Sequence, residues 1–335
     1  MARIFLTGAS GYIGGQVLHT LTSTHPEYEI SVLLRDVAKA EIVSKKYPGV
    51  RVAVGDLDSS SLIEEEAREA NVVVNAATYK HQGSIEAIVR GLSNRTQPGY
   101  LVQISGASLL SIPDIVNNTY GEASGKLYND INDAVEIRDI IHKNAATRTA
   151  DNYLVNLTSP KTALVFPPII YGQGDGPVNQ RSIQVPELSR VAIQTRQTVQ
   201  VGKGESTWSN IHISDLGNVF AKLVEKGVEN AEGALWNQDG LYLVGNNDVL
   251  SFGKISEIVA QAAHSLGLTD STAVRSVSAS EADELTGKGS VFWGTNARQS
   301  SQRSSELLGW IPKAHSLEQE IPLTVKAEAK RLGSL

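Results

Sequence analysis

The first fifteen residues constrain the fold of this chain more than any other stretch. A short apolar run, Arg3 to Leu6, leads into glycines at positions 8, 11 and 14, and helical periodicity continues from Gln16 to Leu21. Strand, glycine turn and helix in this order are typical of the pyrophosphate-binding turn of a dinucleotide fold. A surface turn can match a glycine triplet by chance, so the evidence is its place between a strand and a helix.

Each glycine has a separate task in such a turn. The first permits the tight bend, the second lets the backbone approach the phosphates, and the third lets helix and strand pack closely. The helix N-terminus then faces the anion. We therefore expect the dinucleotide to be contacted by Thr7, Gly8, Ser10, Gly11, Tyr12, Ile13 and Gly14.

Composition excludes several other classes of protein. The chain has 335 residues, of which 41% are hydrophobic and 20% charged, which is ordinary for a globular protein. A net charge of −6 without a basic stripe argues against nucleic acid as a partner. No apolar run is long enough for a membrane span, and the first apolar stretch is used as a strand rather than as a signal peptide. We expect a cytoplasmic protein, either a monomer or a homodimer.

Cysteine and histidine usage bears on metal and redox chemistry. The chain has no cysteine, which excludes disulfides, thiolate catalysis and cysteine-bound zinc. Its seven histidines show no spacing typical of metal ligands, such as His-x-x-x-His. No metal is predicted.

Polar or small residues follow the predicted strands of the first half. Apolar runs at 29–34, 50–54, 71–74, 100–104 and 162–166 alternate with helical stretches. This alternation predicts an α/β fold with a doubly wound parallel sheet, in which ligands bind outside the carboxyl ends of the strands. Five residues stand at such ends and should converge on one cleft: Gly8, Arg35, Asp56, Asn75 and Ser105.

The end of the second strand indicates which cofactor binds. A carboxylate there holds the 2′-hydroxyl of NAD, whereas an arginine accommodates the 2′-phosphate of NADP. Arg35 comes first and Ser10 can add a hydroxyl, so we expect NADP(H), because a planar bidentate donor suits a phosphate. The alternative is that Arg35 is solvated and Asp36 binds the ribose of NAD(H).

The next two strand ends complete the expected cofactor contacts. Asp56 stands where the adenine amino group usually lies, and it can also cap the helix that begins near Ser59. Asn75, Ala76 and Ala77 include small side chains that let the cofactor pass close to the backbone.

The regular pattern stops near residue 172. We expect a dinucleotide-binding domain over 1–172, to which 211–228 returns, and a smaller mixed α/β substrate lobe over 173–335. His212 and Asp215 are adjacent enough for acid–base chemistry, but their stretch more readily packs the two lobes together.

Motifs along nearly the whole chain resemble the extended short-chain dehydrogenase/reductase family, which contains nucleotide-sugar epimerases and dehydratases. They are residues 7–14, Gly55-Asp56-Leu57, Asn75-Ala76-Ala77, residues 168–172, residues 211–216 and residues 308–312. The resemblance implies a Rossmann domain with a C-terminal substrate lobe and a small-molecule substrate between them. It also adds Leu57, Pro168 and Ile169 to the expected cofactor contacts, and Ser105 matches the family's Ser/Thr position.

One departure from the family pattern concerns catalysis. The family's acid is the tyrosine of a Tyr-x-x-x-Lys pair, and none of the ten tyrosines has a lysine four residues later. The slot expected between Ile140 and Arg148 holds no tyrosine, although Arg148 can hold a ribose or a substrate carboxylate there. The chain therefore resembles the atypical NmrA-like branch and related fungal reductases.

The missing acid limits the chemistry. Hydride transfer belongs to the cofactor, but reduction of a carbonyl also needs a proton donor. Besides Ser105, the candidates are Tyr120 and Lys126, in a polar loop over 120–133 that we expect to lie across the cleft. An iminium ion needs no acid, and a carboxylate such as Asp130 stabilises its charge. All three loop residues can equally be ordinary surface groups.

The sequence thus favours an NADP(H)-dependent oxidoreductase that reduces an imine, iminium, activated alkene or carbonyl in secondary-metabolite biosynthesis. The main alternative is a non-catalytic NADP(H)-binding redox sensor of the NmrA type. A nucleotide-sugar epimerase or dehydratase ranks third, because that chemistry depends most on the missing tyrosine.

Overall fold

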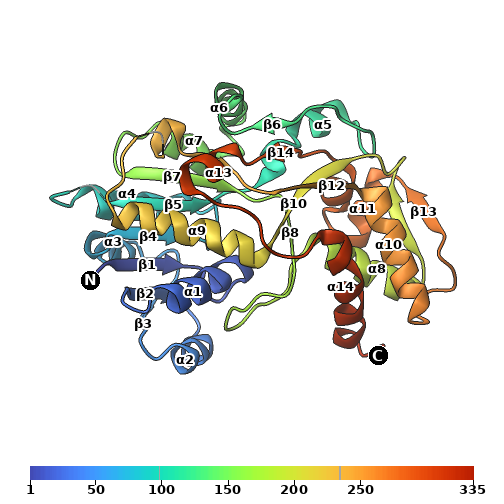
Figure 1. Cartoon of the computed structure of the whole chain (residues 1–335), viewed down its shortest axis with the longest axis horizontal. Coiled ribbons are helices and arrows are strands. Elements are labelled where there is room, and N and C mark those ends of the chain that lie inside the picture. Colours follow the sequence, from blue (N-terminus) through green and yellow to red (C-terminus); the bar gives the residue numbers. More distant parts are fainter. Residues whose placement is uncertain (98, 234) are drawn as a thin grey trace.

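A seven-stranded parallel sheet organises the larger lobe of the chain (Figure 1). The structure is a computed structural model that describes residues 1–97, 99–233 and 235–335. The strand order is β11–β7–β5–β4–β1–β2–β3, so the order reverses between β1 and β4. The strands are β1 (Arg3–Thr7), β2 (Glu29–Leu34), β3 (Arg51–Val54), β4 (Val72–Asn75), β5 (Tyr100–Ile104), β7 (Lys161–Phe166) and β11 (Leu241–Leu243).

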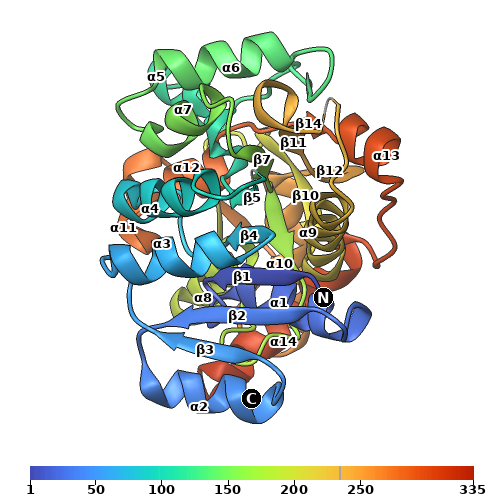
Figure 2. The same cartoon turned by 90° about the vertical axis from the view of Figure 1, so that its left-hand side faces the viewer.

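Helices cover both faces of this sheet, because the strands are apolar on both sides. Phe5 belongs to one core, which is shared with α3, α4 and α7. Ile4 and Leu6 belong to the opposite core, which is shared with α1, α2 and α9. Figure 2 shows α3 and α4 on one side of the sheet and α9 on the other. The bounds are α1 (Tyr12–Thr24), α2 (Val37–Lys46), α3 (Ser60–Glu69), α4 (Gln82–Ser93), α7 (Thr149–Val155) and α9 (Ile213–Val228).

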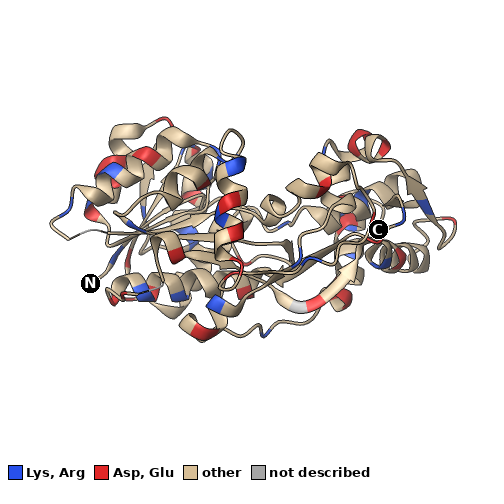
Figure 3. Cartoon of the chain, turned by 90° about the horizontal axis from the view of Figure 1, so that it is seen from above, with Lys and Arg blue, Asp and Glu red and all other residues tan. Residues whose placement is uncertain are grey.

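A smaller lobe is joined to this unit through a second sheet, β12–β10–β8. Its helix α14 (Leu317–Arg331) packs against α8 (Gln184–Thr195) and α10 (Phe252–Ser265). Seen from above, the lobes are separated by a narrower waist, and acidic and basic residues are interspersed on both (Figure 3). Further elements are β8 (Ile169–Tyr171), β9 (Thr198–Val201), β10 (Thr207–His212), β12 (Asn246–Ser251), β13 (Val274–Val277), α5 (Ile112–Asn117), α11 (Ala279–Thr286), α12 (Gly289–Gly294) and α13 (Gln302–Leu308).

Two segments differ in place from the sequence-based expectation. β11 comes from the region expected to form the substrate lobe, yet it pairs with β7 as the edge of the first sheet. A strand of three residues carries too little pattern to reveal which strand it pairs with. Among the described residues, no helix combines the length and apolarity that crossing a bilayer requires.

The loop expected to lie across the cleft is instead tied to the smaller lobe. The Gly121 amide donates to the Gly294 carbonyl at 2.7 Å, and the Asn296 amide donates to the Asp114 carboxylate. Further along, β6 (Tyr128–Asn129) pairs with β14 (Gln299–Ser300) before α6 (Ala134–Lys143) begins. Partners this distant in sequence leave no local signal, so the sequence could not place the loop.

The first turn of α9 holds the C-terminal segment. The buried carboxylate of Asp215 accepts hydrogen bonds from the backbone amides of Lys313, at 3.0 and 3.1 Å, and of Ala314, at 3.0 Å. The indole of Trp310 donates to the Asp215 carbonyl at 3.1 Å. This stretch therefore packs the two lobes together, as the sequence indicated.

Removal of the Asp215 carboxylate should weaken the contact between α9 and the C-terminal segment. We expect Asp215→Ala to lower the free energy of unfolding by about 2–4 kcal/mol, because it leaves buried amides without an acceptor. Urea denaturation followed by tryptophan fluorescence measures the change. Asp270→Ala, which removes an exposed partner of Arg196, is the control and should leave the midpoint unchanged. Equal midpoints for Asp215→Ala and the wild type would contradict this role.

Candidate functional site

The glycine turn brings the end of β1 against the end of β4. Gly8 has φ +85°, and a Cβ there would lie 2.6 Å from the Ala77 nitrogen. A Cβ on Gly14 would lie 2.3 Å from the Gly8 carbonyl oxygen. Both positions therefore require glycine. Gly11 is the N-cap of α1 and supplies no capping side chain, so the first amides of the helix remain available to an anion.

A cleft of about 430 Å³ opens at this turn and gathers many of the predicted residues. Those predicted from the sequence that line it are Thr7, Gly8, Ser10, Gly11, Arg35, Asp56, Leu57, Ala76 and Ala77. The structure adds Leu33, Leu34, Gly55, Asp58 and His81. His81 caps α4 and contacts Asp58 at 3.2 Å, a pairing that the sequence did not suggest.

Other predicted cofactor contacts do not line this cleft. The Tyr12 hydroxyl donates to the Gly172 carbonyl at 2.6 Å, so its ring fastens the turn to the segment after β8. Ile169 and Gly14 are buried, and Ile13 is partly buried. Pro168 packs near Gly245.

Arg35 and Asp36 differ in the hydrogen bonds that their side chains make. The Asp36 carboxylate caps α2 by accepting from the amides of Ala38 at 3.0 Å and Lys39 at 3.3 Å. Arg35 is exposed at the cleft and has no hydrogen bond or ion pair with another described residue. The guanidinium, rather than the neighbouring carboxylate, is therefore available to a ligand.

Asp56 combines a structural role with a free oxygen. Its Oδ1 accepts from the Ser59 hydroxyl at 2.9 Å and from the Asp58 amide at 3.0 Å, which closes the turn before α3. The hydrogen bond from Ser59 is the main cause that lowers the pKa of Asp56, so the group is ionised at neutral pH. Its Oδ2 makes neither of these bonds, and Asp56 lines the cleft.

A chain of polar side chains connects the ends of the three central strands. The Thr7 hydroxyl donates to Asn75, whose amide donates to Gln103 at 2.8 Å. Gln103 donates in turn to the Ile104 carbonyl at 2.7 Å. Asn75 is thus buried as a connector between strands, and the polar chain leads to Ser105 at the end of β5.

At that strand end, Ser105 meets two charged residues of the α7 region. Its hydroxyl donates to Asp151 Oδ2 at 2.9 Å, and Arg148 Nη1 lies 3.5 Å from the same oxygen. Arg148 also donates to the Ser108 hydroxyl at 2.9 Å and lies over the Tyr79 ring, 5.4 Å from its centre. Ser105, Arg148 and Asp151 expose 5%, 6% and 0% of their surfaces.

The electrostatics of this group depend on its burial. Burial raises the pKa of Asp151 to about 6, although Arg148 and the Ser105 hydroxyl oppose the shift. Asp151 Oδ1 and Arg148 Nη1 have no hydrogen-bond partner within the described parts of the chain. A buried carboxyl group with an unused oxygen and a pKa near neutrality can exchange a proton with its serine partner.

The sequence did not single out Asp151, although a signal existed. It stands three residues after Arg148, on the helix that leads to the strand beside β5. A carboxylate at this spacing from an arginine is compatible with one helix face. Only the fold brings that face to Ser105.

The other predicted catalytic residues have separate partners. Tyr120 lies against Gly294 and Val201 in the smaller lobe, and Lys126 pairs with Glu136 at 2.6 Å on the surface. Asp130 is fully buried, where it accepts from the amides of Leu243 at 3.2 Å and Arg303 at 2.9 Å. The hydroxyl of Ser105 makes its hydrogen bond with Asp151 and with none of these three.

Comparison with known proteins agrees with this architecture. A model described as the NmrA-like family matches residues 1–90. Oxidase ucsJ from Acremonium sp is 35% identical over 344 residues, an alignment that covers 99% of this chain and 99% of that protein.

Solved structures share the fold over the full length. The PbgP3 protein from Burkholderia pseudomallei aligns with a TM-score of 0.67 at 17% identity, covering 99% of this chain and 98% of that one. A dTDP-glucose 4,6-dehydratase from Bacillus anthracis, solved in complex with NAD, aligns with a TM-score of 0.65 at 15% identity, covering 100% and 98%. Identities this low establish similarity of fold alone.

The buried carboxyl group should make stability depend on pH. Asp151 has a pKa of about 6 in the folded chain and an ordinary value of 3.8, so its favourable contribution is complete below pH 3.8 and is lost as pH rises through 6. Relative to Asp151→Asn, the wild type should lose roughly 2–3 kcal/mol of unfolding free energy between pH 4 and 7. Urea denaturation across that range measures the difference. A difference that does not change with pH would refute the raised pKa.

Proposed function

We propose a function from the premise that this chain belongs to the NmrA-like branch of the extended short-chain dehydrogenase/reductase family. The chain is an NADP(H)-dependent oxidoreductase that reduces a small imine, iminium, activated alkene or carbonyl compound in secondary-metabolite biosynthesis. One observation carries this proposal: the cleft lies at the strand reversal beside β1, and the buried Ser105–Asp151–Arg148 group stands at the end of β5, two strands away in the same sheet. The 35% sequence identity to Oxidase ucsJ from Acremonium sp supports a redox role.

The residues present fit a phosphorylated dinucleotide. The uncapped N-terminus of α1 suits the pyrophosphate, and the close backbone approach at Gly8 leaves room for it. Arg35, without a partner among the described residues, suits the 2′-phosphate, since Asp36 is already engaged as a helix cap. Asp56 Oδ2 suits the adenine amino group. When bound, the cofactor supplies the hydride.

The nicotinamide end is assigned from the topology. Dinucleotides bind across the point where the strand order reverses, here between β1 and β4. The ends of β2 and β3 would hold the adenosine, and the end of β5 would hold the nicotinamide half. Ser105 would then be the side chain that meets the substrate, with Asp151 and Arg148 acting through it.

Ser105 and Asp151 can together replace the absent tyrosine. When Asp151 is protonated, its O–H donates to Ser105 Oγ, which frees the serine proton for the substrate oxygen or nitrogen. The substrate accepts a hydride on carbon and the serine proton on its heteroatom. At the same time Asp151 transfers its proton to Ser105 Oγ and becomes ionised. Arg148, which lies 3.5 Å from Asp151, stabilises the carboxylate that results. Asp151 and Arg148 are therefore positioning residues.

Cofactor choice is tested at Arg35. We expect Arg35→Ala to weaken NADPH binding by about tenfold or more, because a charged hydrogen bond contributes about 1.5–3 kcal/mol, and to leave NADH binding unchanged. Titration of protein fluorescence with each cofactor measures both affinities. Arg138→Ala, which removes an exposed arginine bonded to the Gln238 carbonyl, is the matched control. Equal effects of Arg35→Ala on the two cofactors would contradict the assignment.

Reaction class is tested with a substrate panel. Ketones, enones and cyclic imines are incubated with NADPH, whose oxidation is followed by absorbance. We expect Ser105→Ala to lower kcat for a carbonyl substrate by about 100-fold or more, and to affect a preformed iminium ion far less, because only the carbonyl needs a donated proton. Tyr120→Phe should leave both activities unchanged.

Two results would change the proposal. A loss of activity in Tyr120→Phe but not in Ser105→Ala would assign the proton to the loop that carries Tyr120, one of the donors expected from the sequence besides Ser105. No turnover of any substrate, with equal affinity for NADP⁺ and NADPH, would favour the second candidate, a redox sensor. The absence of a Tyr-x-x-x-Lys pair is the observation that favours the redox sensor as a second candidate.

A further inference from the structure

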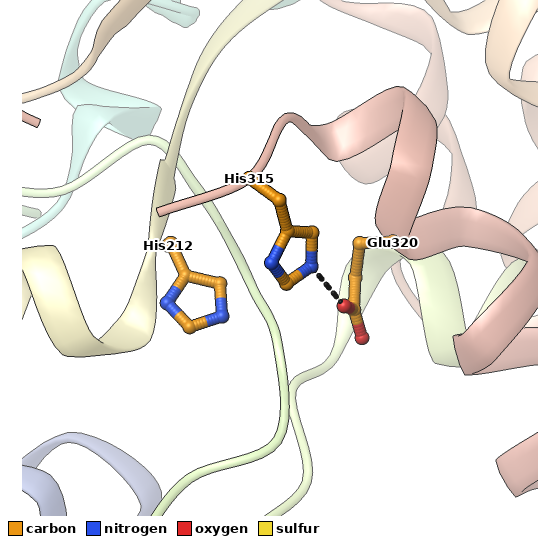
Figure 4. A group of neighbouring side chains, drawn as sticks. All are labelled: His212, His315 and Glu320. Carbon is orange, nitrogen blue, oxygen red and sulfur yellow. Dashed lines mark hydrogen bonds and ion pairs between the residues drawn. The ribbon is translucent and has the colours of Figure 1, made fainter. Parts of the chain in front are cut away.

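Three side chains form a compact group outside the dinucleotide cleft. They are His212, at the N-cap of α9, His315, in the segment before α14, and Glu320, within α14. One nitrogen of each histidine and one carboxylate oxygen all lie within 4.8 Å of one another (Figure 4). His212 is far from His315 and Glu320 in the sequence, which is why the spacing of the histidines gave no sign of the group.

The fold holds this group in place from several sides. Asp215, one turn into α9, binds the amides of Lys313 and Ala314 and so brings the next residue, His315, beside His212. The Tyr171 hydroxyl donates to the His315 carbonyl at 2.7 Å. The two imidazole centres are 5.1 Å apart. The backbone at both histidines is therefore fixed before any ligand arrives.

The His212 ring is held in place through its Nδ1, which accepts from the Ser214 backbone amide at 3.2 Å and lies 2.7 Å from the Ser214 hydroxyl. In the neutral ring this bond leaves the proton on Nε2. Binding of a metal ion at Nε2 therefore requires the proton to move to Nδ1, where the Ser214 hydroxyl can accept it. A hydrogen bond from the second nitrogen of this kind commonly orients a metal-binding histidine.

Glu320 is a buried carboxylate with few partners. It exposes 7% of its surface, and within the described ranges its side chain bonds to His315 at 2.6 Å and Thr324 at 3.4 Å. The nearby guanidinium groups of Arg181 and Arg331 pair with Glu328 instead. A buried carboxylate is stabilised by a cation, and the side chain closest to Glu320 is the imidazole of His315.

The group opens on a cavity of about 620 Å³. Its walls include Gly172 and Gln173 from the segment after β8 and Leu323 from α14. Figure 4 shows His315 between His212 and Glu320, and 40% of its side-chain surface is exposed, so its ring can turn toward a shared ligand. An ion bound here would keep coordination positions open to the cavity.

We propose that His212, His315 and Glu320 bind a divalent transition-metal ion, with Zn²⁺ as the best match. Two imidazole nitrogens and one carboxylate oxygen are a donor set that holds Zn²⁺ in open sites, and the remaining position takes water or a small ligand. The ion joins α9 of the larger lobe to α14 of the smaller one. It supplies a positive charge beside Glu320, whose hydrogen-bond partners among the described residues are His315 and Thr324.

The test uses the full chain after treatment with a chelator. Titration with Co²⁺, followed by its visible absorption, should show one equivalent bound through nitrogen and oxygen ligands, and Zn²⁺ should displace it. Zn²⁺ should also raise the melting temperature. Because mutation of residues around a metal ligand costs about 10- to 100-fold in affinity, loss of a ligand in His315→Ala or Glu320→Gln should cost at least about tenfold.

The matched control is His142→Ala, which removes an exposed histidine of α6 and should retain full Co²⁺ affinity. Circular dichroism and urea midpoints establish that each variant is folded, and the exposed His315 remains informative if Glu320→Gln is not. No stoichiometric binding by the wild type would overturn the proposal. Equal weakening in His142→Ala and His315→Ala would reduce it to adventitious binding by surface histidines.

Discussion

The contact between the ends of β1 and β4 is the constraint on which the rest of the structure depends. At Gly8 the backbone comes so near to Ala76 and Ala77 that no side chain fits. This approach sets the reversal of strand order and aims the uncapped N-terminus of α1 at the cleft. The end of β2, with Arg35, and the end of β5, with Ser105, then flank one continuous edge.

Along that edge, the charged residues at the two ends differ in their exposure to solvent. Arg35 and Asp56 are exposed and ready for polar groups of a ligand, at little desolvation cost. Arg148 and Asp151 are buried, and their burial brings the pKa of the carboxyl group close to neutrality. The first arrangement suits binding and the second suits proton exchange, so in the proposed function recognition and chemistry take place at different strand ends.

Local patterns in the sequence predicted the parts of the fold that local physics determines. The glycine turn, the buried strands and the residues at their ends follow from spacing within a few residues, and the resulting α/β sheet is confirmed. The positions of β11 and Asp151, and the place of His212 beside His315, could not be predicted, because their partners are distant in sequence. Tyr120, Lys126 and Asp130 were assigned through the loop that carries them, and the Gly121–Gly294 bond ties that loop to the other lobe.

The position of β11 has a consequence for how this chain is made. A ribosome releases residues 1–172 first, but the edge of β7 stays unpaired until residues 241–243 emerge. The face covered by α9 also stays open until residue 228 has been synthesised. An unpaired strand edge can pair with other chains, so we expect the nascent first half to be prone to aggregation during synthesis. The sheet of the first half is therefore complete only when β11 and α9 have joined it.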